Sequence, residues 1–537
     1  MRFYLFRRLH EKECVRPQLQ HYSRKYAHRH ITASDPSDSS PHDGFITSQA
    51  AMLRITANVP NGVAMPIITV GDVLASGYRY EAIPDGIDFV RKGNTIEAYI
   101  SHETSLVPFP AVSAAGGGLS DFDNAQVSKL TLNKKTGGVL AGEYVITSAE
   151  NYQRFCSAFM ATKEHGFKNP VYFANEEATD FVSPPPLLAW PPDPANRRQA
   201  GLVVAYDTKT KQKYEIPGLG RMNHENTIVL ERDWDPIVAL TGDDTFSAPS
   251  SQLYMYLAKN AKAFLNDQGA LYAFVADNPA INDYGDISGN MSIGGRFVPV
   301  PREVALGDQT VLENWSNANN VFQFIRVEDI ASDKNDTRVV YFADTGEPRA
   351  IASATTGRLA RGPSGTQGPY PNGRIFKMVI NEDDPTIVDS LSILIDADAG
   401  GYNNPGVLHN PDNLDTSENS LMIGEDPGSH NSFAGGAGPA GRVWRYDLRT
   451  GQFTVVAEVN QSADPAARQG AWETSGVVDA STLFGEGAWL INVQAHTLFV
   501  QSEVRTVTDT TRNPPVTGPV TFKREGGQLL LMVVPGS

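Results

Sequence analysis

A chain of 537 residues with a formal net charge of −16 is not a general nucleic-acid binder, because such proteins depend on basic surface for their affinity. Its 47 Gly and 35 Pro are typical of a turn-rich globular protein and argue against a helical bundle. No apolar run is long enough to span a membrane. Only two cysteines, Cys14 and Cys156, are present, so the sequence offers no disulfide scaffold.

The N-terminal segment differs in charge from the rest of the chain. Residues 1–31 contain eight Lys and Arg against two acidic residues, and residues 32–44 have the composition of a linker. We expect residues 1–44 to form a disordered basic tail and linker. Arg7-Arg8 is not followed by an apolar segment, so no clear signal peptide is present. A transit-like tail and a true start near Met52 are both open interpretations.

Residues 45–537 contain a recurring β-hairpin pattern. Each copy opens on a small residue, alternates apolar and polar side chains, turns through polar residues and alternates again. The copies are residues 125–146, 201–219, 269–277, 373–395 and 441–459. Spacings that leave room for a four-stranded sheet per copy are typical of a β-propeller.

A second kind of strand precedes these hairpins and ends in a polar side chain. The strands are residues 95–103, 169–177, 337–346, 419–428 and 487–496. A strand-end acid by itself usually caps loop amides. In a propeller, however, the strand ends of successive blades meet at the central channel, where clustered carboxylates repel one another unless cations separate them.

The sequence therefore predicts an all-β fold: a single six-bladed β-propeller over residues 45–537, with long loop insertions and the disordered N-terminal tail. We expect the motifs that carry function to lie within about residues 84–496. The predicted polar cluster at the channel mouth favours a site filled with metal ions.

Three further groups of residues point to the same mouth. His224-Glu225 precedes an apolar strand, and Arg326 and Glu328 would share one face of an extended segment. Asp412, Asn413, Glu425 and Asp426 offer oxygen ligands of the kind that Ca2+ prefers. Cys156, the only cysteine of the body, is either a buried core residue or a ligand.

Together these motifs carry a family resemblance. The ordered set ISHE, RFCS, NEEA, GRMNHEN, GDDT, QLYMY, FIRVED, VYFADTG, NPDNL, GEDPG, WETSG and INVQAH resembles the PhoX-type alkaline phosphatase family of metal-dependent β-propellers. The resemblance runs from about Pro84-Asp85-Gly86 to His496, roughly three-quarters of the chain. It implies hydrolysis of phosphate monoesters at a cluster of iron (Fe3+) and calcium (Ca2+) ions.

The resemblance also implies roles for single residues. Arg326 matches the arginine that binds the substrate phosphate, and Arg326 and Glu328 are the expected catalytic residues. Cys156 matches the thiolate ligand of an iron ion. The full set of expected metal ligands is Cys156, Glu177, Glu225, Glu328, Asp412, Asp426, Glu103 and Glu176. Glu176 is the alternative to Glu177, and the choice between Asp412 and Asp426 is open.

Some positions depart from the family pattern and indicate a divergent branch. The Gly-rich run expected around the cysteine is Phe155-Cys156-Ser157-Ala158-Phe159 here, and the Pro before the glutamate of the Arg-Pro-Glu-Asp motif is Val327. At the expected histidine position stands Ala495, with His496 after it. The ligand types are retained better than the residues around them.

We therefore expect a metal-dependent phosphatase acting on a small phosphate ester, monomeric, with no nucleic-acid partner and no membrane span. The resemblance implies export to the periplasm or the outside of the cell. Two alternatives remain: a calcium-dependent propeller hydrolase of the lactonase type, and a non-catalytic binding propeller stabilised by calcium.

Overall fold

The structure is a computed structural model that describes residues 43–231, 233–245, 251–428 and 438–537. The predicted tail and linker, residues 1–44, thus lies almost wholly outside the described residues. Within them, no helix is long and apolar enough to cross a membrane.

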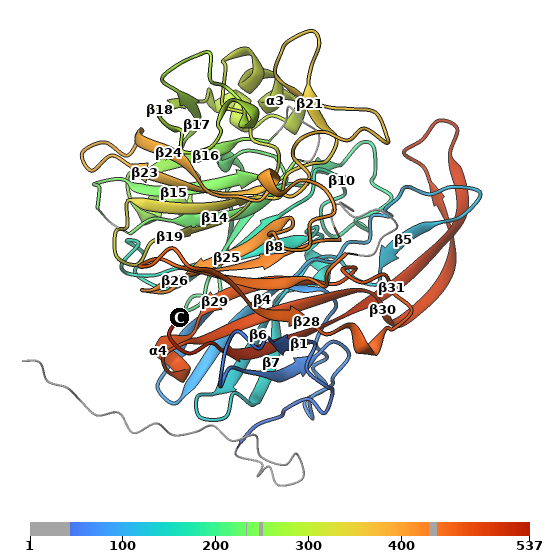
Figure 1. The fold of residues 1–537 in the computed structure, drawn as a ribbon. Helices are drawn as coiled ribbons and strands as arrows, with labels where there is room; N and C mark the ends of the chain where they lie inside the picture. The colour runs from blue at the N-terminus through green and yellow to red at the C-terminus, as the bar shows by residue number, and fades with distance from the viewer. Residues whose placement is uncertain (1–42, 232, 246–250, 429–437) are drawn as a thin grey trace, which may run out of the picture. The chain divides into compact units, whose positions relative to one another are not determined.

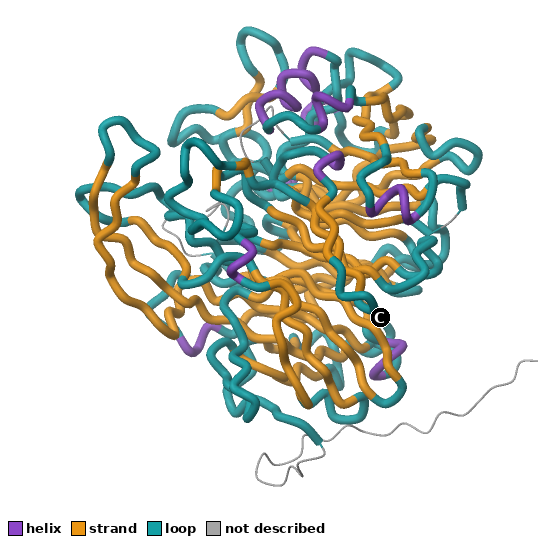
Figure 2. The backbone as a smooth tube through the Cα atoms, turned by 180° about the vertical axis from the view of Figure 1, so that it is seen from behind, coloured by secondary structure: helices purple, strands orange, loops and turns teal. Residues whose placement is uncertain are grey.

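β-Strands dominate the described part of the chain (Figure 2). Its α-helices are short and lie on connections: α1 (Ala261–Leu265), α2 (Arg302–Ala305), α3 (Gln309–Ala318) and α4 (Ser481–Phe484). The predicted all-β fold is confirmed.

The strands form antiparallel sheets that follow one another along the chain (Figure 1). The first sheet contains β3 (Pro84–Lys92), β4 (Thr95–His102), β6 (Gln126–Asn133) and β7 (Val139–Ile146). The second contains β8 (Phe155–Ala161), β9 (Val171–Glu176), β12 (Val203–Asp207) and β13 (Lys213–Glu215).

Two further four-strand series are joined into one sheet. The first series is β14 (His224–Val229), β15 (Ile237–Asp243), β16 (Leu253–Ala258) and β17 (Ala270–Ala276). The other series is β19 (Val327–Ser332), β20 (Val339–Asp344), β23 (Arg374–Ile380) and β24 (Ile387–Asp396). β18 (Ser292–Pro299) pairs with both β17 and β24, so the two series share a nine-stranded sheet.

The last two sheets include strands from the N-terminal part of the described chain. One contains β25 (Pro411–Thr416), β26 (Ser420–Glu425), β27 (Arg442–Asp447), β28 (Phe453–Val459) and, at its edge, β1 (Leu53–Ile55). The other contains β29 (Glu473–Asp479), β30 (Ala488–Asp509), β31 (Val516–Val533) and β2 (Val63–Thr69). Early strands that complete late sheets hold the two ends of the ring together.

The first strand of each series lies next to the first strand of the following series. β3, β8, β14, β19, β25 and β29 contact one another in this order, and β29 contacts β3 again, which closes the ring. We call these the inner strands. Such a ring is the arrangement of a β-propeller. The predicted number of six blades agrees with the six inner strands, but β18 merges two series, so the number stays a prediction.

Adjacent sheets pack through the alternating side chains of their strands. Tyr99 of β4 and Val127 of β6 share one buried cluster with Tyr172 of β9 and Val204 of β12. Because successive side chains of a strand point to opposite faces, each sheet can bury apolar residues against both neighbours. This packing fixes the inner strands around the channel.

Most of the predicted hairpins occur in the structure. β6–β7, β12–β13, β23–β24 and β27–β28 are antiparallel pairs at the predicted places. Residues 269–277 are different, because they form β17 alone, which pairs with the separate strand β18. The segment lacks the polar turn that the other copies share.

Insertions decorate the ring, as predicted. Small two-stranded sheets form from β10 (Phe181–Val182) with β11 (Arg198–Gln199) and from β21 (Ala350–Ala352) with β22 (Leu359–Arg361). The distal parts of β30 and β31 extend from the ring as a long hairpin arm (Figure 1). At the base of this arm, β31 pairs in parallel with β5 (Gly118–Asp121).

Candidate metal centre

The inner strands place a polar side chain at the same position, close to the strand start. The second residue of β3, β8, β14, β19 and β25 is Asp85, Cys156, Glu225, Glu328 and Asp412, in that order. β29 begins with Glu473. Since the inner strands form a ring, these side chains meet at one mouth of the channel.

The pairing of each inner strand shifts at or just after this position, as in a β-bulge. The pairing shifts between Pro84 and Ile87 in β3, and between Phe155 and Ala158 in β8. Corresponding shifts occur in β14, β19, β25 and β29. A bulge adds one residue to one strand and turns its side chains locally, which is common beside functional sites. Here it directs the second residue toward the channel.

The neighbouring strand of several sheets contributes the residue that follows its end. Glu103 follows β4, Glu177 follows β9 and Asp426 follows β26. In an antiparallel pair, the end of the second strand lies beside the start of the first. The predicted convergence of these strand ends on the mouth therefore occurs for these three residues.

The side chains of both kinds form a continuous series of candidate metal sites. Ligand atoms lie within 4.8 Å of one another in four groups: Asp85–Glu103–Cys156, Cys156–Glu177–Glu225, Glu225–Glu328–Asp412 and Asp412–Asp426–Glu473. Cys156, Glu225 and Asp412 each belong to two groups. This sharing would let neighbouring cations be bridged by one side chain.

Burial makes this cluster unfavourable without cations. Burial, followed by the charges of Asp85 and Glu225, raises the pKa of the Cys156 thiol well above its ordinary value. Burial also raises the pKa values of Glu225, Glu328 and Asp412 well above the ordinary range for carboxyl groups. Buried carboxylates at such short separations cannot all ionise unless positive charge compensates them.

Some carboxylate oxygens of the cluster accept no hydrogen bond, which is expected of oxygens that bind a metal ion. Glu328 Oε1 and Asp412 Oδ1 are buried and accept no hydrogen bond in the described structure, and the cation nearest to Glu328 Oε1 is Arg326 Nη2 at 3.4 Å. Buried acceptors without partners are costly, and a cation would satisfy them. The residues present therefore fit cations held by carboxylate oxygens and one thiolate.

Polar side chains that contact the ligands hold them in place. Ser157 Oγ donates to Glu225 Oε1 at 2.6 Å, and Asn413 Nδ2 donates to Ser157 Oγ at 2.8 Å. Gln494 Nε2 lies 3.0 Å from Asp85 Oδ2 and 3.1 Å from Glu103 Oε2. Such outer contacts orient the ligands of metal sites.

Arg326 lies at the edge of the cluster and pairs with an acid that the sequence analysis did not identify. Its Nε and Nη2 donate to the two carboxylate oxygens of Asp244, at 2.6 and 2.5 Å. Arg326 Nη2 is also 3.4 Å from Glu328 Oε1. The planar guanidinium is thus held in a fixed orientation beside the third group.

Glu176 and His496 belong to none of the four ligand groups and have other partners. Glu176 accepts from Arg198 Nη1 at 3.1 Å and from the backbone amide of Gln153 at 2.8 Å, and it belongs to none of the four groups. His496 Nε2 lies 3.4 Å from Glu473 Oε1. The adjacent glutamates of the NEEA motif therefore have different surroundings.

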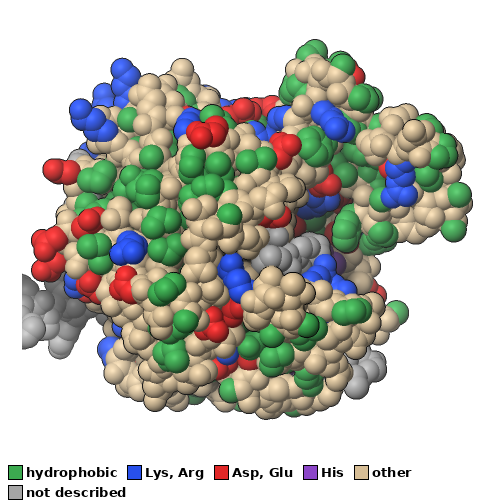
Figure 3. Space-filling view, turned by 90° about the horizontal axis from the view of Figure 1, so that it is seen from above, with side chains coloured by type: hydrophobic (Ala, Val, Ile, Leu, Met, Phe, Trp, Pro, Cys, Tyr) green, Lys and Arg blue, Asp and Glu red, His purple; other side chains and the backbone are tan. Residues whose placement is uncertain are grey.

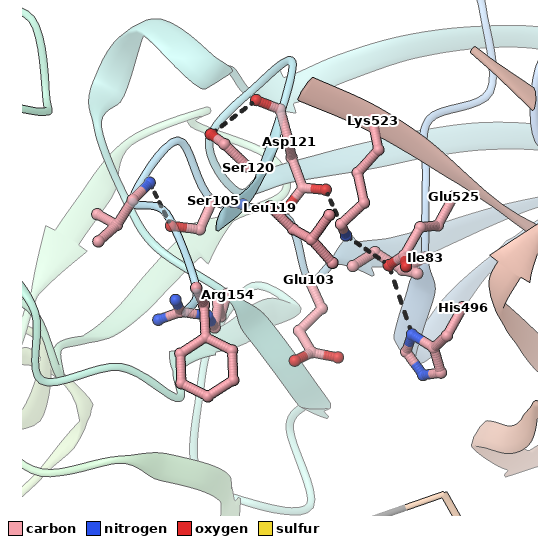
Figure 4. A pocket seen from close by; sticks show the side chains of 12 residues that line it. Ile83, Glu103, Ser105, Leu119, Ser120, Asp121, Arg154, His496, Lys523 and Glu525 are labelled. Atoms are coloured by element: carbon pink, nitrogen blue, oxygen red, sulfur yellow. Dashed lines mark hydrogen bonds and ion pairs between the residues drawn. The ribbon is translucent and has the colours of Figure 1, made fainter. Parts of the chain in front are cut away.

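A cavity of about 190 Å³ lies beside the first group (Figure 4). Glu103 belongs to both the cavity wall and the metal-ligand group. Figure 4 shows Glu103 between Arg154 on one side and His496, Lys523 and Glu525 on the other. The protein surface seen from above is hollowed, with acidic and basic side chains at the edge of the hollow (Figure 3).

Asp85, Asp244 and Glu473 complete the site, although the sequence analysis did not assign them. Asp85 stands in the Pro84-Asp85-Gly86 segment where the resemblance begins, and Glu473 stands in WETSG. The signal that could have found Asp85 is its place as second residue of an inner strand, as for Cys156. This pattern, a polar residue in second place in a strand, involves only two residues in each blade, which is too short to be recognised in the sequence alone.

Comparison with known proteins gives a family match and similar folds. Residues 131–495 match the family model described as alkaline phosphatase PhoX. No curated protein matches the chain. Pseudomonas fluorescens PhoX, in complex with the transition-state analogue vanadate, is similar in structure, with a TM-score of 0.59 and 14% sequence identity over 92% of this chain and 97% of that chain.

Other solved structures resemble the chain more distantly. An α-L-arabinanase from Penicillium chrysogenum has a TM-score of 0.39 and 9% identity, over 89% of this chain and 99% of that one. The β-propeller domain of the Trilobed protease from Pyrococcus furiosus has a TM-score of 0.27 and 7% identity, over 83% and 98%.

Proposed function

We propose that this chain, which belongs to the PhoX alkaline phosphatase family, hydrolyses phosphate monoesters at a metal cluster in the mouth of its propeller channel. The observation that carries the proposal is the unbroken series of four ligand groups that share Cys156, Glu225 and Asp412. A series of this kind provides for several cations close together, and closely spaced metal ions catalyse phosphoryl transfer in two-metal sites.

The donor types support a mixed set of metal ions. The Cys156 thiolate suits iron better than calcium, whereas the groups made only of carboxylates suit calcium. We propose Cys156, Glu103, Glu177, Glu225, Glu328, Asp412 and Asp426 as ligands, together with Asp85 and Glu473. Glu176 is the less favoured alternative to Glu177, because Arg198 already neutralises it.

The cations would polarise the phosphoryl oxygens and lower the pKa of a water molecule, which supplies the nucleophile. Arg326 would then bind the phosphoryl oxygens and stabilise the negative charge that develops on them in the transition state. Asp244 keeps the Arg326 guanidinium in one orientation through two hydrogen bonds. Glu328 lies beside both Arg326 and the shared ligand Asp412, so it couples phosphate binding to the cluster.

A small soluble phosphate monoester is consistent with a mouth lined by charged side chains, and we infer an exported enzyme from its membership of the family.

Elemental analysis combined with activity assays tests this proposal. The purified protein should contain iron together with calcium and should hydrolyse 4-nitrophenyl phosphate. Calcium alone, with turnover of lactones, would instead indicate a lactonase-type hydrolase. Calcium without turnover of either substrate class would indicate a binding propeller.

A further inference from the structure

The cavity beside Glu103 combines charged and apolar walls. Ser105, Val107, Phe109 and Leu119 come from the segment after β4 and from β5, and Lys523 comes from β31 at the base of the arm. Phe109 is 68% exposed, so an apolar surface is available to a ligand. Because Glu103 also belongs to the first ligand group, the cavity adjoins the metal centre.

Two of the cationic side chains in the cavity wall already have acidic partners. Lys523 Nζ lies 3.1 Å from Asp121 Oδ1 and 2.7 Å from Glu525 Oε2. His496 lies between Glu473 and Glu525, at 3.4 and 3.5 Å. Their positive charge is therefore matched within the wall.

Arg154 also has an acidic partner, Asp180, but uses only one of its nitrogens for it. Its Nη1 donates to Asp180 Oδ2 at 2.5 Å, but its Nε and Nη2 groups have no protein partner among the described residues. The Arg154 side chain lines the cavity and is 22% exposed. A guanidinium carries five N–H donors in one plane, so several of them can serve a ligand.

The backbone holds Arg154 beside the metal ligands. Its amide donates to the carbonyl of Thr104 at 3.1 Å, and its carbonyl accepts from the amide of Glu177 at 2.9 Å. Arg154 has a φ of +42°, in the left-handed region that non-glycine residues rarely occupy. Residues held in this way are common at ligand sites, where the surrounding structure fixes them.

We infer that this cavity is a subsite for the leaving group of the phosphate ester, and that Arg154 binds an anionic substituent of that group. The inference rests on the proposed phosphatase function. The preferred esters carry a carboxylate or a second phosphate a few bonds from the ester oxygen, and Phe109 and Val107 contact their carbon skeleton. Arg326 and the metal centre bind the phosphoryl group that is transferred.

A matched pair of substrates tests this inference. 3-Phosphoglycerate and glycerol 3-phosphate differ by a carboxylate in place of a hydroxymethyl group. The wild-type protein should show a higher kcat/KM for 3-phosphoglycerate. Arg154→Gln should lower the ratio of the two kcat/KM values roughly 10- to 100-fold, as expected for the loss of a charge-assisted hydrogen bond. The ratio is independent of the fraction of enzyme that carries metal.

Asp180→Asn provides the control, since it breaks the same ion pair but retains Arg154. This variant should keep the wild-type ratio or increase it. An equal loss in both variants would show that Arg154 acts only through its pair with Asp180 and would overturn the inference. An unchanged ratio in Arg154→Gln would overturn it as well.

Binding of substrate analogues gives a second readout without turnover. 2-Carboxyethylphosphonate should bind the metal-loaded wild-type protein more tightly than propylphosphonate in calorimetry, and Arg154→Gln should remove the difference. Equal binding of the two phosphonates to the wild type would contradict the subsite. Failure of the phosphatase function itself would be recognised separately, as absence of hydrolysis of 4-nitrophenyl phosphate by the wild type.

Discussion

Cys156 on β8 and Asp85 on β3 lie in direct contact, with 3.1 Å between Sγ and Oδ2. The two residues are second in neighbouring inner strands, and each lies within a β-bulge. A thiol and a carboxyl group at this distance share one environment, so the protonation of one affects the other. A cation that replaces the shared proton would bind both groups.

Substitutions of Cys156 distinguish its two possible roles, as a metal ligand and as a hydrogen-bond donor to Asp85. Cys156→Ala should remove most of the iron and lower kcat/KM for 4-nitrophenyl phosphate by at least roughly 100-fold, because the thiolate ligand is lost. Cys156→Ser retains a donor toward Asp85 but offers no thiolate, so it should be as defective. Recovery of iron and activity in the serine variant would show that the hydrogen bond alone matters.

The adjacent glutamates Glu176 and Glu177 should respond differently to the same substitution. Glu177→Gln should reduce the metal content, because Glu177 belongs to the second ligand group. Glu176→Gln should leave the metal content unchanged and lower the free energy of unfolding by roughly 1–3 kcal/mol, because the buried contacts with Arg198 weaken. Elemental analysis and chemical denaturation of both variants measure these effects. A larger metal loss in Glu176→Gln would reverse the assignment.

Stability should depend on pH in opposite ways with and without metal. Burial, together with the charge of Asp85, raises the pKa of Glu103 to about 7. Between about pH 4.5 and 7 the metal-free folded state then holds a proton that the unfolded chain has released. The unfolding free energy of metal-free protein should fall as pH rises through this range.

The affinity of the protein for metal, and with it the stability of the metal-loaded form, should fall as pH falls below about 7, since protons compete for Glu103. Thermal denaturation at several pH values, with and without chelator, checks both trends. Glu103→Gln should flatten the slope for the metal-free protein. A wild-type metal-free protein that became more stable toward pH 7 would contradict the pKa of Glu103.

Close packing of the inner strands should also affect the site. A Cβ atom on Gly86 would lie 2.5 Å from the carbonyl oxygen of Cys156 and 2.4 Å from the amide of Ala158. Gly86→Ala should therefore push β3 from β8, lower stability by roughly 1–3 kcal/mol and weaken metal binding. Gly406→Ala, on an exposed loop, should change neither quantity. Titration of metal into both variants distinguishes the two cases.

The sequence predicted the parts of the fold that have a local signal. Alternating strands with polar turns, such as β6–β7 and β27–β28, were found because the hairpin pattern lies within about twenty residues. The strand-end residues Glu103, Glu177 and Asp426 were found because a polar residue stands out after an apolar strand. Their meeting at one mouth followed from the propeller geometry.

Other features depend on distant contacts and have no such signal. Nothing near Asp244 in the sequence indicates that it pairs with Arg326, which lies 82 residues later. Likewise, Glu425 ends an apolar strand like a ligand, but it is neutralised by Arg442 at 2.8 Å from the neighbouring strand. β18 joins two sheets only because the chain returns to the edge of β24.

Hydrolysis of 4-nitrophenyl phosphate before and after removal of metal tests the central claim most directly. The wild-type protein should hydrolyse this ester, lose the activity on treatment with chelator and regain it when iron and calcium are restored. Glu328→Gln should remain inactive after the same treatment, because a ligand of the third group is missing. Activity that persists in chelator, or that is unchanged in both Cys156→Ala and Glu328→Gln, would contradict a phosphatase centred on these residues.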